Sequence, residues 1–479
     1  MTGTLIGKQQ QIADQVLAAL KLKQTDHAIY LSGEMGVGKT YIASYILNKL
    51  IQQKDHLSLV VTPSIVADKW VKVLKDFTDP DKTIIIKLSP RKIDKQIAQY
   101  QNCSDHTRFI FVAAPNCLKA INGYVNNTYL FEHINLIVDE IQEYQRTRLK
   151  YIINLIRQTS REDSNILALT GTIFDGVGDN LADLLNVTNP TVYKKYNYSL
   201  TNLPNFMRYI WQYISVSISM EDLKAENQIE NQNIQQAILP INYLPLTELE
   251  QAFYHLTTIQ AKHLGITNYK QVASDLLDNP EKDPIKLNRD RQTINHQMTA
   301  SLLTLPLEPI AFSETKKYKA LLAFLENIDP KQKVLIYAND PALIETLTQQ
   351  LNFDGFRTTS FVKATNDIEQ RLQKATQDYN IIVADPKIMK VGVDVSDISY
   401  LVWYQLLSTM TDILQAQRRI TRLDSKTPST VKFLAYDNTY QRELLDTISQ
   451  ANKNNAAAYG TKDQSNLTKL TGILLKGID

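Results

Sequence analysis

Residues 28–50 read AIYLSGEMGVGKTYIASYILNKL: a short apolar run, a loop with three glycines, and a segment of helical periodicity. Gly33-x4-Gly38-Lys39-Thr40 matches the phosphate-binding pattern G-x-x-x-x-G-K-[ST], in the strand–loop–helix order that the pattern requires. Glycines let successive backbone N–H groups converge on one point, and the positive end of the following helix is directed at the same point. The stretch predicts a nucleotide site in which Lys39 reaches the β- and γ-phosphates and the Thr40 hydroxyl ligates Mg²⁺.

Length and composition favour a globular protein with a large core. The chain has 479 residues, of which 43% are hydrophobic and 21% charged. By length this suggests about three domains, or two large ones with an insertion. Lys plus Arg total 52 against 50 Asp plus Glu, for a net charge of +2. Any basic track for nucleic acid must therefore be local.

The compartment follows from the cysteines and from the apolar segments. Cys103 and Cys117 are the only two cysteines, and they form neither a zinc pattern nor a disulfide framework, which suits a reducing compartment. The start, MTGTLIGKQQQ, has no apolar signal core, and no segment approaches the ~18 apolar residues of a membrane span. We expect a cytoplasmic protein, in the nucleoid or a host cytoplasm, with no membrane partner.

A second chemical signal is INLIVDEIQ at residues 134–142. The apolar run ends in Asp139 and Glu140, which a buried strand would place at its carboxyl end. One carboxylate can hold Mg²⁺ while the other activates water. Gln142 could sense the γ-phosphate or link two halves of a site. Acidic strand ends are common, but a phosphate loop in the same sheet favours the catalytic interpretation.

Two shorter signals leave alternatives open. Gln9, upstream of the phosphate loop, has an amide that could hydrogen-bond to an adenine edge, yet three adjacent glutamines also suit a solvated helix start. Thr170-Gly171-Thr172 ends another strand candidate. It could couple the nucleotide site to a neighbouring surface, or it could be an ordinary turn.

Strand and helix patterns alternate in two separate regions, which predicts parallel sheets with ligands at the carboxyl edge. The later region has no phosphate loop but contains QAQRRITR at 415–422. Arg419 and Arg422 would share a helix face, either as a basic surface or as cations against a γ-phosphate. The predicted domains are a first α/β lobe at 1–190, a helical insertion or linker at 191–310, a second α/β lobe at 311–450, and a polar tail at 451–479.

The ordered set of motifs resembles the superfamily-two helicases and translocases, and looks most like the Swi/Snf-type DNA-dependent ATPases. The resemblance rests on the following stretches: GEMGVGKT, VVTPSIVADKW with Trp70, VDEIQ, LTGTIFDGVGDNLADLLN, ILPINYLPLTELEQAFY, SETKKYKALLAFL, KVLIYAND and QAQRRITR. Four positions depart from the family pattern: Ile173, Asp385, Gln405 and Arg418.

The resemblance implies two RecA-like parallel-sheet lobes in tandem, with ATP and Mg²⁺ between them. Asp139 would hold Mg²⁺ with Thr40, Glu140 would be the catalytic base, Gln9 would read adenine, and Arg419 and Arg422 would be arginine fingers. The implied nucleotide contacts are Gln9, Gly33, Glu34, Met35, Gly36, Val37, Gly38, Lys39, Thr40, Gly392 and Asp394. The implied nucleic-acid contacts are Thr62, Pro63, Pro115, Asn116, Thr170, Tyr337 and Asn339.

Three functions are compatible with these residues. The first is a DNA-stimulated ATPase, a helicase or double-stranded DNA translocase, with replication or recombination proteins as partners in phage or mobile-element DNA. The second is an ATP-gated loader or recruitment module with little motor activity, which Arg418 and the altered fifth motif at Asp385 would favour. The third is an RNA helicase, which the Swi/Snf-like Glu-Met-Gly lead and Trp70 disfavour.

Overall fold

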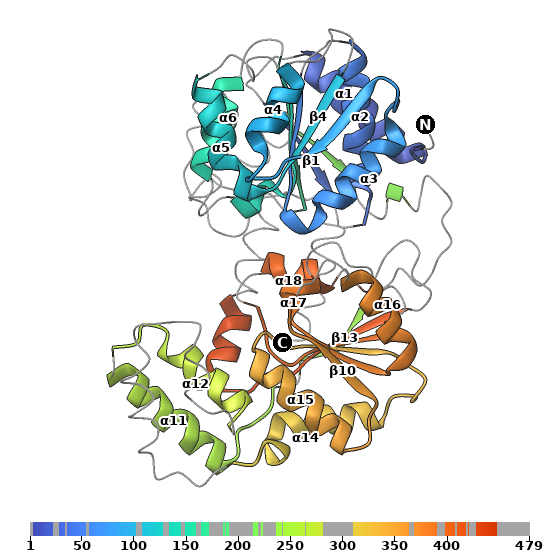
Figure 1. Ribbon diagram of the computed structural model, residues 1–479. Coiled ribbons are helices and arrows are strands. Elements are labelled where there is room, and N and C mark those ends of the chain that lie inside the picture. Colours follow the sequence, from blue (N-terminus) through green and yellow to red (C-terminus); the bar gives the residue numbers. More distant parts are fainter. Residues whose placement is uncertain are drawn as a thin grey trace. The chain divides into compact units, whose positions relative to one another are not determined.

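Parallel strands alternate with helices in two regions of the chain, as the sequence pattern predicted (Figure 1). The structure is a computed structural model. It describes residues 3–22, 28–33, 36–53, 57–101, 108–127, 134–144, 149–159, 164–171, 185–186, 188–190, 214–218, 222–223, 236–241, 243–263, 265–280, 310–363, 368–389, 398–407, 410–417, 420 and 428–447. Chain contacts divide these residues into a first unit, up to residue 223, and a second unit, from residue 236 onward.

The first unit is built on a seven-stranded sheet of order β3-β4-β2-β5-β6-β1-β7, in which every neighbouring pair is parallel. Its strands β1 and β5 flank β6, so the carboxyl ends of all three lie at one edge, where parallel sheets bind ligands. The strands are β1 (Ala28–Gly33), β2 (Leu57–Val61), β3 (Thr83–Lys87), β4 (Arg108–Ala113), β5 (Ile134–Val138), β6 (Asn165–Thr170) and β7 (Ser215–Ile218).

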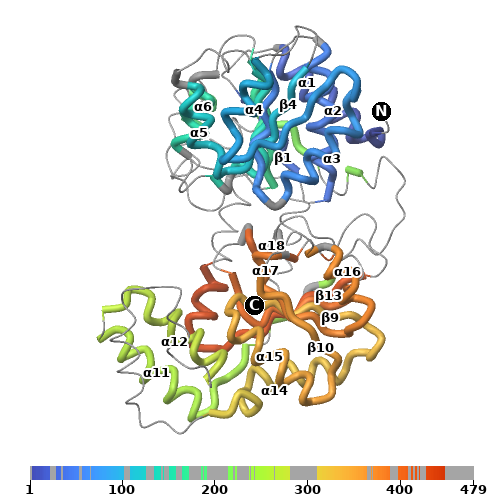
Figure 2. Tube along the Cα trace, in the orientation of Figure 1, coloured from blue at the N-terminus to red at the C-terminus, as the bar shows by residue number. Residues whose placement is uncertain are grey.

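Helices cover both faces of this sheet (Figures 1 and 2). Because neither face meets solvent, β5 is apolar and buried at four of its positions, and Asn135 is buried at the fifth. Helix α3 shows the one-sided pattern of a covering helix, since its buried residues recur every three or four positions. The helices are α1 (Gly7–Leu22), α2 (Lys39–Gln53) and α3 (Ala67–Phe77) on one face, with α4 (Ile93–Gln101), α5 (Leu118–Asn127) and α6 (Leu149–Thr159) on the other.

The second unit has a six-stranded sheet of order β10-β11-β9-β12-β13-β8, again parallel throughout. Its strands are β8 (Gln236–Ile238), β9 (Val334–Tyr337), β10 (Thr358–Phe361), β11 (Ile381–Ala384), β12 (Tyr400–Trp403) and β13 (Ser429–Phe433). Its helices are α11 (Glu248–His263), α12 (Tyr269–Asp278), α14 (Lys316–Glu326), α15 (Pro341–Phe353), α16 (Ile368–Asp378), α17 (Pro386–Met389) and α18 (Met410–Gln417). Among the described residues, no helix combines the length and apolar character that crossing a bilayer needs.

The segment predicted as a helical insertion or linker, 191–310, contains the helices α11 and α12, but its described residues also contribute one strand to each sheet. Its strand β7 pairs with β1 in the first sheet, and its strand β8 pairs with β13 in the second. Its helices α11 and α12 belong to the second unit and lie side by side there (Figures 1 and 2). Both β7 and β8 are short and contain polar residues, so the sequence pattern does not predict them. The predicted tail, 451–479, lies outside the described residues.

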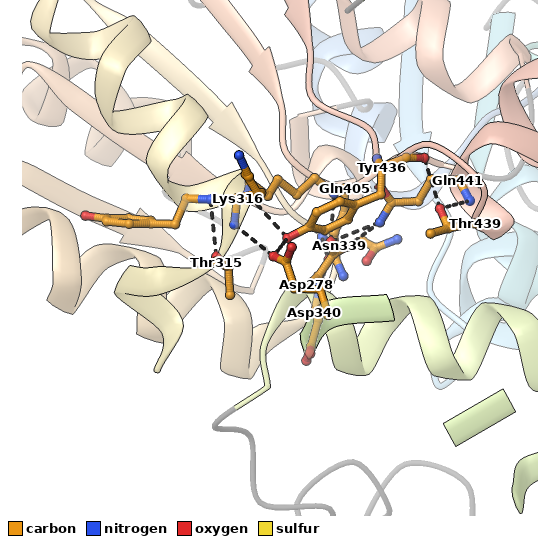
Figure 3. A network of polar contacts seen from close by, with 12 residues as sticks. Asp278, Thr315, Lys316, Asn339, Asp340, Gln405, Tyr436, Thr439 and Gln441 are labelled. Carbon is orange, nitrogen blue, oxygen red and sulfur yellow. Dashed lines mark hydrogen bonds and ion pairs between the residues drawn. The ribbon is translucent and has the colours of Figure 1, made fainter. Parts of the chain in front are cut away.

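A buried ion pair fastens α12 to the rest of the second unit (Figure 3). The Lys317 ammonium in α14 lies 2.7 Å from an Asp278 carboxylate oxygen at the end of α12, and the two side chains are 1% and 2% exposed. Gln441 completes the pair. Its Oε1 accepts from Lys317 at 3.0 Å, and its Nε2 donates to both Asp278 oxygens at 2.9 and 3.0 Å. Every strong polar group of the pair therefore has a partner, which is the condition for burying charge.

A second bond set fastens α11 in the same place. The Glu250 carboxylate accepts hydrogen bonds from the Lys316 backbone N–H at 2.8 Å and from the Tyr436 hydroxyl at 2.7 Å (Figure 3). The other Glu250 oxygen accepts from the Thr247 N–H at 2.8 Å, which caps the start of α11. Helices α11 and α12 are therefore integral parts of the second unit.

Candidate nucleotide and metal site

The phosphate loop lies between β1 and α2. Gly36 and Gly38 both have φ of +86°, a left-handed conformation that glycine adopts at little cost. Helix α2 begins directly after them at Lys39, so its N-terminus, the positive end of the helix dipole, points back at the loop. This local geometry suits a bound anion, and phosphate binding here stays a prediction.

Lys39 is held over this loop by β1. Its ammonium group donates a hydrogen bond to the Gly33 carbonyl at 2.7 Å. Gly33 itself must lack a side chain, because a Cβ would lie 2.7 Å from the Ile218 Cγ2 and 3.0 Å from the Ile218 carbonyl of β7. Strand β7 thus packs directly against Gly33, where the phosphate loop begins.

Gln9 braces the same loop from α1. Its Nε2 donates to the Val37 carbonyl at 2.8 Å, and its Oε1 accepts from the Ile6 N–H at 3.3 Å. The side chain is 9% exposed, and a Cβ on Gly38 would come within 2.4 Å of its Nε2. Gln9 is therefore part of the loop's support, and its contact with adenine stays a prediction.

Asp139 follows β5 and is nearly buried, at 7% exposed. Its backbone N–H donates to the Val61 carbonyl of β2 at 2.8 Å. Its Oδ2 accepts two side-chain hydrogen bonds, from the Thr62 hydroxyl at 3.0 Å and from the Trp70 indole N–H at 2.7 Å. Two adjacent elements, β2 and α3, thus fix the orientation of this carboxylate.

The electrostatics of Asp139 are those of an under-compensated charge. The pKa of this carboxyl is raised from 3.8 to about 6, with burial as the largest cause and repulsion by Glu140 acting in the same direction. The hydrogen bonds from Trp70 and Thr62 and the charge of Lys39 lower the pKa, but they offset burial only in part. A bound cation would complete the compensation.

Glu140 has a strained backbone. Its φ of 50° lies in the left-handed region, which non-glycine residues seldom occupy and which is found mostly where function requires it. The half-buried side chain directly follows Asp139 at the carboxyl edge of the sheet. This position fits the predicted role of Glu140 toward an attacking water.

Thr40 and Asp139 fit the predicted Mg²⁺. Thr40 lies in the first turn of α2, and both residues offer the hard oxygen ligands that Mg²⁺ prefers. No group of three or more His, Cys, Asp and Glu that could hold a metal occurs in the described part of the chain.

The predicted nucleic-acid contacts divide by burial. The side chains of Thr62, Thr170 and Tyr337 are all 0% exposed. Thr62 donates to Asp139, and the Tyr337 hydroxyl donates to the Ala416 carbonyl at 3.1 Å. These three side chains are buried in this structure, and their contact with nucleic acid stays a prediction.

The other four predicted contacts are accessible. Asn116 is exposed, and Pro63, Pro115 and Asn339 are half-buried. Asn339 follows β9, and its backbone N–H donates to the Gln405 Oε1 at 3.0 Å, as does that of Asp340 at 3.2 Å (Figure 3). Gln405, which replaces an Asp of the family pattern, therefore holds the loop after β9 in place. Binding of nucleic acid at these positions stays a prediction.

Several predicted site residues lie outside the described residues: Glu34, Met35, Gly392, Asp394, Arg419 and Arg422. Gln142 falls in a short 3₁₀ helix, Ile141–Tyr144, and its side chain is likewise outside the described part. The roles that the sequence suggests for these residues therefore stay predictions.

Trp70 makes a contact at the candidate site that the sequence does not reveal. It is part of the stretch that carries the family resemblance, but nothing in the sequence shows that its indole N–H donates to Asp139. The usable signal was chemical, because a tryptophan on the buried face of a helix needs an acceptor for its N–H. Sequence spacing alone could not identify which acceptor that would be.

Comparisons with known proteins match both units. The family described as Type III restriction enzyme, res subunit, matches residues 3–175, and the Helicase conserved C-terminal domain matches residues 316–424. The chain is 21% identical over 462 residues to a Methanocaldococcus jannaschii protein provisionally named an ATP-dependent RNA helicase, covering 86% of this chain and 56% of that one. It is 23% identical over 141 residues to DEAD-box ATP-dependent RNA helicase 20 of Arabidopsis thaliana, covering 29% and 28%.

The matches thus span about half or less of the length of these relatives. Among solved structures, the Pyrococcus furiosus Hef helicase domain superposes with a TM-score of 0.53 at 13% identity, covering 92% of this chain and 97% of that one. At this identity the likeness concerns the fold. The names of these relatives do not include Swi/Snf proteins. The chain is thus similar in sequence to these two families over the matched ranges, one in each unit, and similar in fold to the Hef helicase domain.

Proposed function

We propose that this chain is an ATP-dependent motor that uses hydrolysis to move on nucleic acid. One observation carries the proposal: a phosphate loop and an under-compensated buried carboxylate, Asp139, are built into the same sheet, within electrostatic reach of each other through Lys39. A protein that only packed its core would neutralise such a carboxylate or replace it. A nucleotide with its Mg²⁺ supplies the missing positive charge.

The described residues have separable tasks in hydrolysis. Lys39 and the N-terminus of α2 would bind the β- and γ-phosphates, and Thr40 and Asp139 would hold Mg²⁺, which draws charge from the phosphates as they are cleaved. Glu140 would orient the attacking water and accept its proton. Arg419 and Arg422, as predicted, would stabilise the charge that develops on the γ-phosphate.

We propose DNA as the nucleic acid, with activity as a helicase or a double-stranded DNA translocase. The Swi/Snf-like Glu-Met-Gly lead, the buried Trp70 and the restriction-enzyme family match in the first unit support this substrate. RNA is the second candidate, because the relatives named above are called RNA helicases. In either case contacts to the sugar–phosphate backbone would give weak sequence preference and strong salt dependence.

The deciding measurement is the steady-state ATPase rate without nucleic acid and with single-stranded DNA, double-stranded DNA or RNA. We expect severalfold stimulation by DNA that declines as salt rises. Stimulation by RNA alone would select the second candidate, and stimulation by none would overturn the motor. Glu140→Gln is the control, since it should still bind ATP while losing hydrolysis under all four conditions.

A further inference from the structure

Two buried donors from one stretch of chain converge on a single oxygen of Asp139. Thr62 directly follows β2, and Trp70 lies in α3, with a short 3₁₀ helix, Ser64–Val66, between them. Their donor atoms lie 3.0 and 2.7 Å from the Asp139 Oδ2, and the two side chains are 0% and 1% exposed. Neither of these two bonds uses Oδ1.

The chemistry of the two donors distinguishes orientation from neutralisation. A hydroxyl and an indole N–H are uncharged, so they fix the carboxylate in space while leaving most of its charge in place. Where this protein buries an aspartate for structure, as at Asp278, it supplies a lysine at 2.7 Å instead. Hydrogen bonds from two neutral donors orient Asp139 without supplying a counter-charge, which is the arrangement expected when a bound ligand is to supply that charge.

We propose that Trp70 and Thr62 are positioning residues for the metal: by holding Oδ2 they fix the Asp139 side chain and leave Oδ1 as the oxygen that serves Mg²⁺. The inference rests on the proposed function, in which Asp139 and Thr40 hold Mg²⁺ with the nucleotide. Neither Trp70 nor Thr62 touches the nucleotide or the reacting atoms in this scheme. Their loss should therefore weaken the metal's contribution and leave nucleotide binding without metal unchanged.

Conservative variants isolate the two hydrogen bonds. Trp70→Phe removes the indole N–H and keeps an aromatic ring, and Thr62→Val removes the hydroxyl and keeps the shape. The chain offers matched controls in the second unit: the Trp403 Nε1 and the Thr358 hydroxyl are buried and have no hydrogen-bond partner in the described part of the chain. Trp403→Phe and Thr358→Val therefore make the same chemical changes without removing a bond.

The main readout is equilibrium binding of a fluorescent ATP analogue as Mg²⁺ is increased, with binding in EDTA as the metal-free reference. We expect the Mg²⁺ midpoint to rise about 10-fold in Trp70→Phe and in Thr62→Val, and further in the double variant, as removal of a supporting bond to a metal ligand typically does. Binding in EDTA and both control variants should match the wild type. In ATPase assays the Mg²⁺ requirement should rise while the rate at saturating Mg²⁺ largely recovers.

An unchanged Mg²⁺ midpoint in both first-unit variants, with circular dichroism like that of the wild type, would overturn the inference. So would equal losses of nucleotide binding with and without Mg²⁺, since that outcome indicates a damaged loop. Failure of the proposed function gives a different result. If the wild type binds nucleotide with Mg²⁺ but nucleic acid does not stimulate its ATPase, the motor is rejected. The binding test on the Trp70 and Thr62 variants can still be carried out and interpreted in that case.

Discussion

Each unit of this protein buries an aspartate, and the two are treated in opposite ways. Asp278 in the second unit, 2% exposed, is paired with the Lys317 ammonium at 2.7 Å and with both donors of Gln441. Asp139 in the first unit, 7% exposed, receives its two side-chain hydrogen bonds from uncharged groups and has a like charge, Glu140, beside it. Burial raises the pKa of both carboxyls, but within the described part of the chain a full counter-charge at hydrogen-bonding distance is found for Asp278 and not for Asp139.

The difference separates a structural buried charge from a functional one. A buried charge with an opposite charge beside it holds elements of the fold together, and replacing the whole pair by apolar residues changes stability little. An oriented and only partly compensated charge destabilises the fold slightly, and under the proposed function the protein retains it because a bound cation would use it. Substitutions at the two sites should therefore move stability and activity in different directions.

The largest expected effect is on hydrolysis. Asp139→Asn should lower the ATPase rate by about 100-fold or more, because the ligand that helps Mg²⁺ stabilise the transferring phosphate is lost. Asp278→Asn should stay within a few-fold of the wild type at temperatures where it remains folded. Steady-state ATPase assays with saturating ATP measure both, and equal losses would erase the distinction between the two sites.

The next effect is on the stability of the second unit. Lys317→Ala should cost about 3–5 kcal/mol, since it leaves the Asp278 carboxylate buried without its partner. The double variant Lys317→Met/Asp278→Leu should recover most of that loss, because an apolar pair of similar size needs no compensation. Urea unfolding followed by fluorescence of Trp403, which is buried in this unit, reports both variants. A double variant as unstable as the single one would contradict a paired role for Asp278.

The pH dependence of stability sharpens the contrast at Asp139. Its pKa is about 6 in the folded protein against an ordinary 3.8, so the folded state holds this proton more tightly. The resulting stabilisation is fully present below about pH 4 and is lost as pH rises through about 6. Asparagine does not titrate, so the stability of Asp139→Asn relative to the wild type should increase across that window by about 2–3 kcal/mol and then level off. Urea unfolding of the wild type and of Asp139→Asn in EDTA at pH 4 to 8 tests this prediction. A stability difference between the two proteins that does not change with pH would contradict the raised pKa.

The smallest effect should come from an ion pair of similar length on the surface. Lys87 lies 2.7 Å from Asp68, but the two side chains are 44% and 81% exposed. Asp68→Ala should change stability by less than about 0.5 kcal/mol, because water already solvates both charges. Thermal unfolding is sufficient to measure it. A loss as large as that of Lys317→Ala would show that burial is not what separates these sites.

The fold was largely predictable because its signals are local. A largely apolar run such as Ile134–Val138 is sufficient by itself to predict a buried strand. The phosphate loop predicts the strand before it and the helix after it. Strands β7 and β8 were missed because each is only a few residues long, has mixed polarity, and is stabilised by a partner strand far away in the chain. Pairing of that kind overrides local propensity.

The site was predictable in its ligands but not in their supports. Lys39, Asp139 and Glu140 follow from motif chemistry. The grip of Trp70 and Thr62 on Asp139, and the brace of Gln9 on Val37, are contacts across 69, 77 and 28 residues of chain. Thr62 shows the cost of this limit. The family resemblance implies a nucleic-acid contact for Thr62, and the sequence does not show that its hydroxyl lies inside the protein and donates to Asp139.

The Lys317–Asp278 pair also determines how this protein can be divided for study. A fragment cut at residue 311, the boundary that strand and helix patterns suggest, would retain Lys317 and discard Asp278, so a cation would be stranded in an apolar interior. It would also lose Glu250, which receives the backbone N–H at the start of α14. An isolated second unit, or a chimera that exchanges it with the corresponding unit of a related protein, should therefore begin before β8, so that α11 and α12 stay with the unit that they anchor.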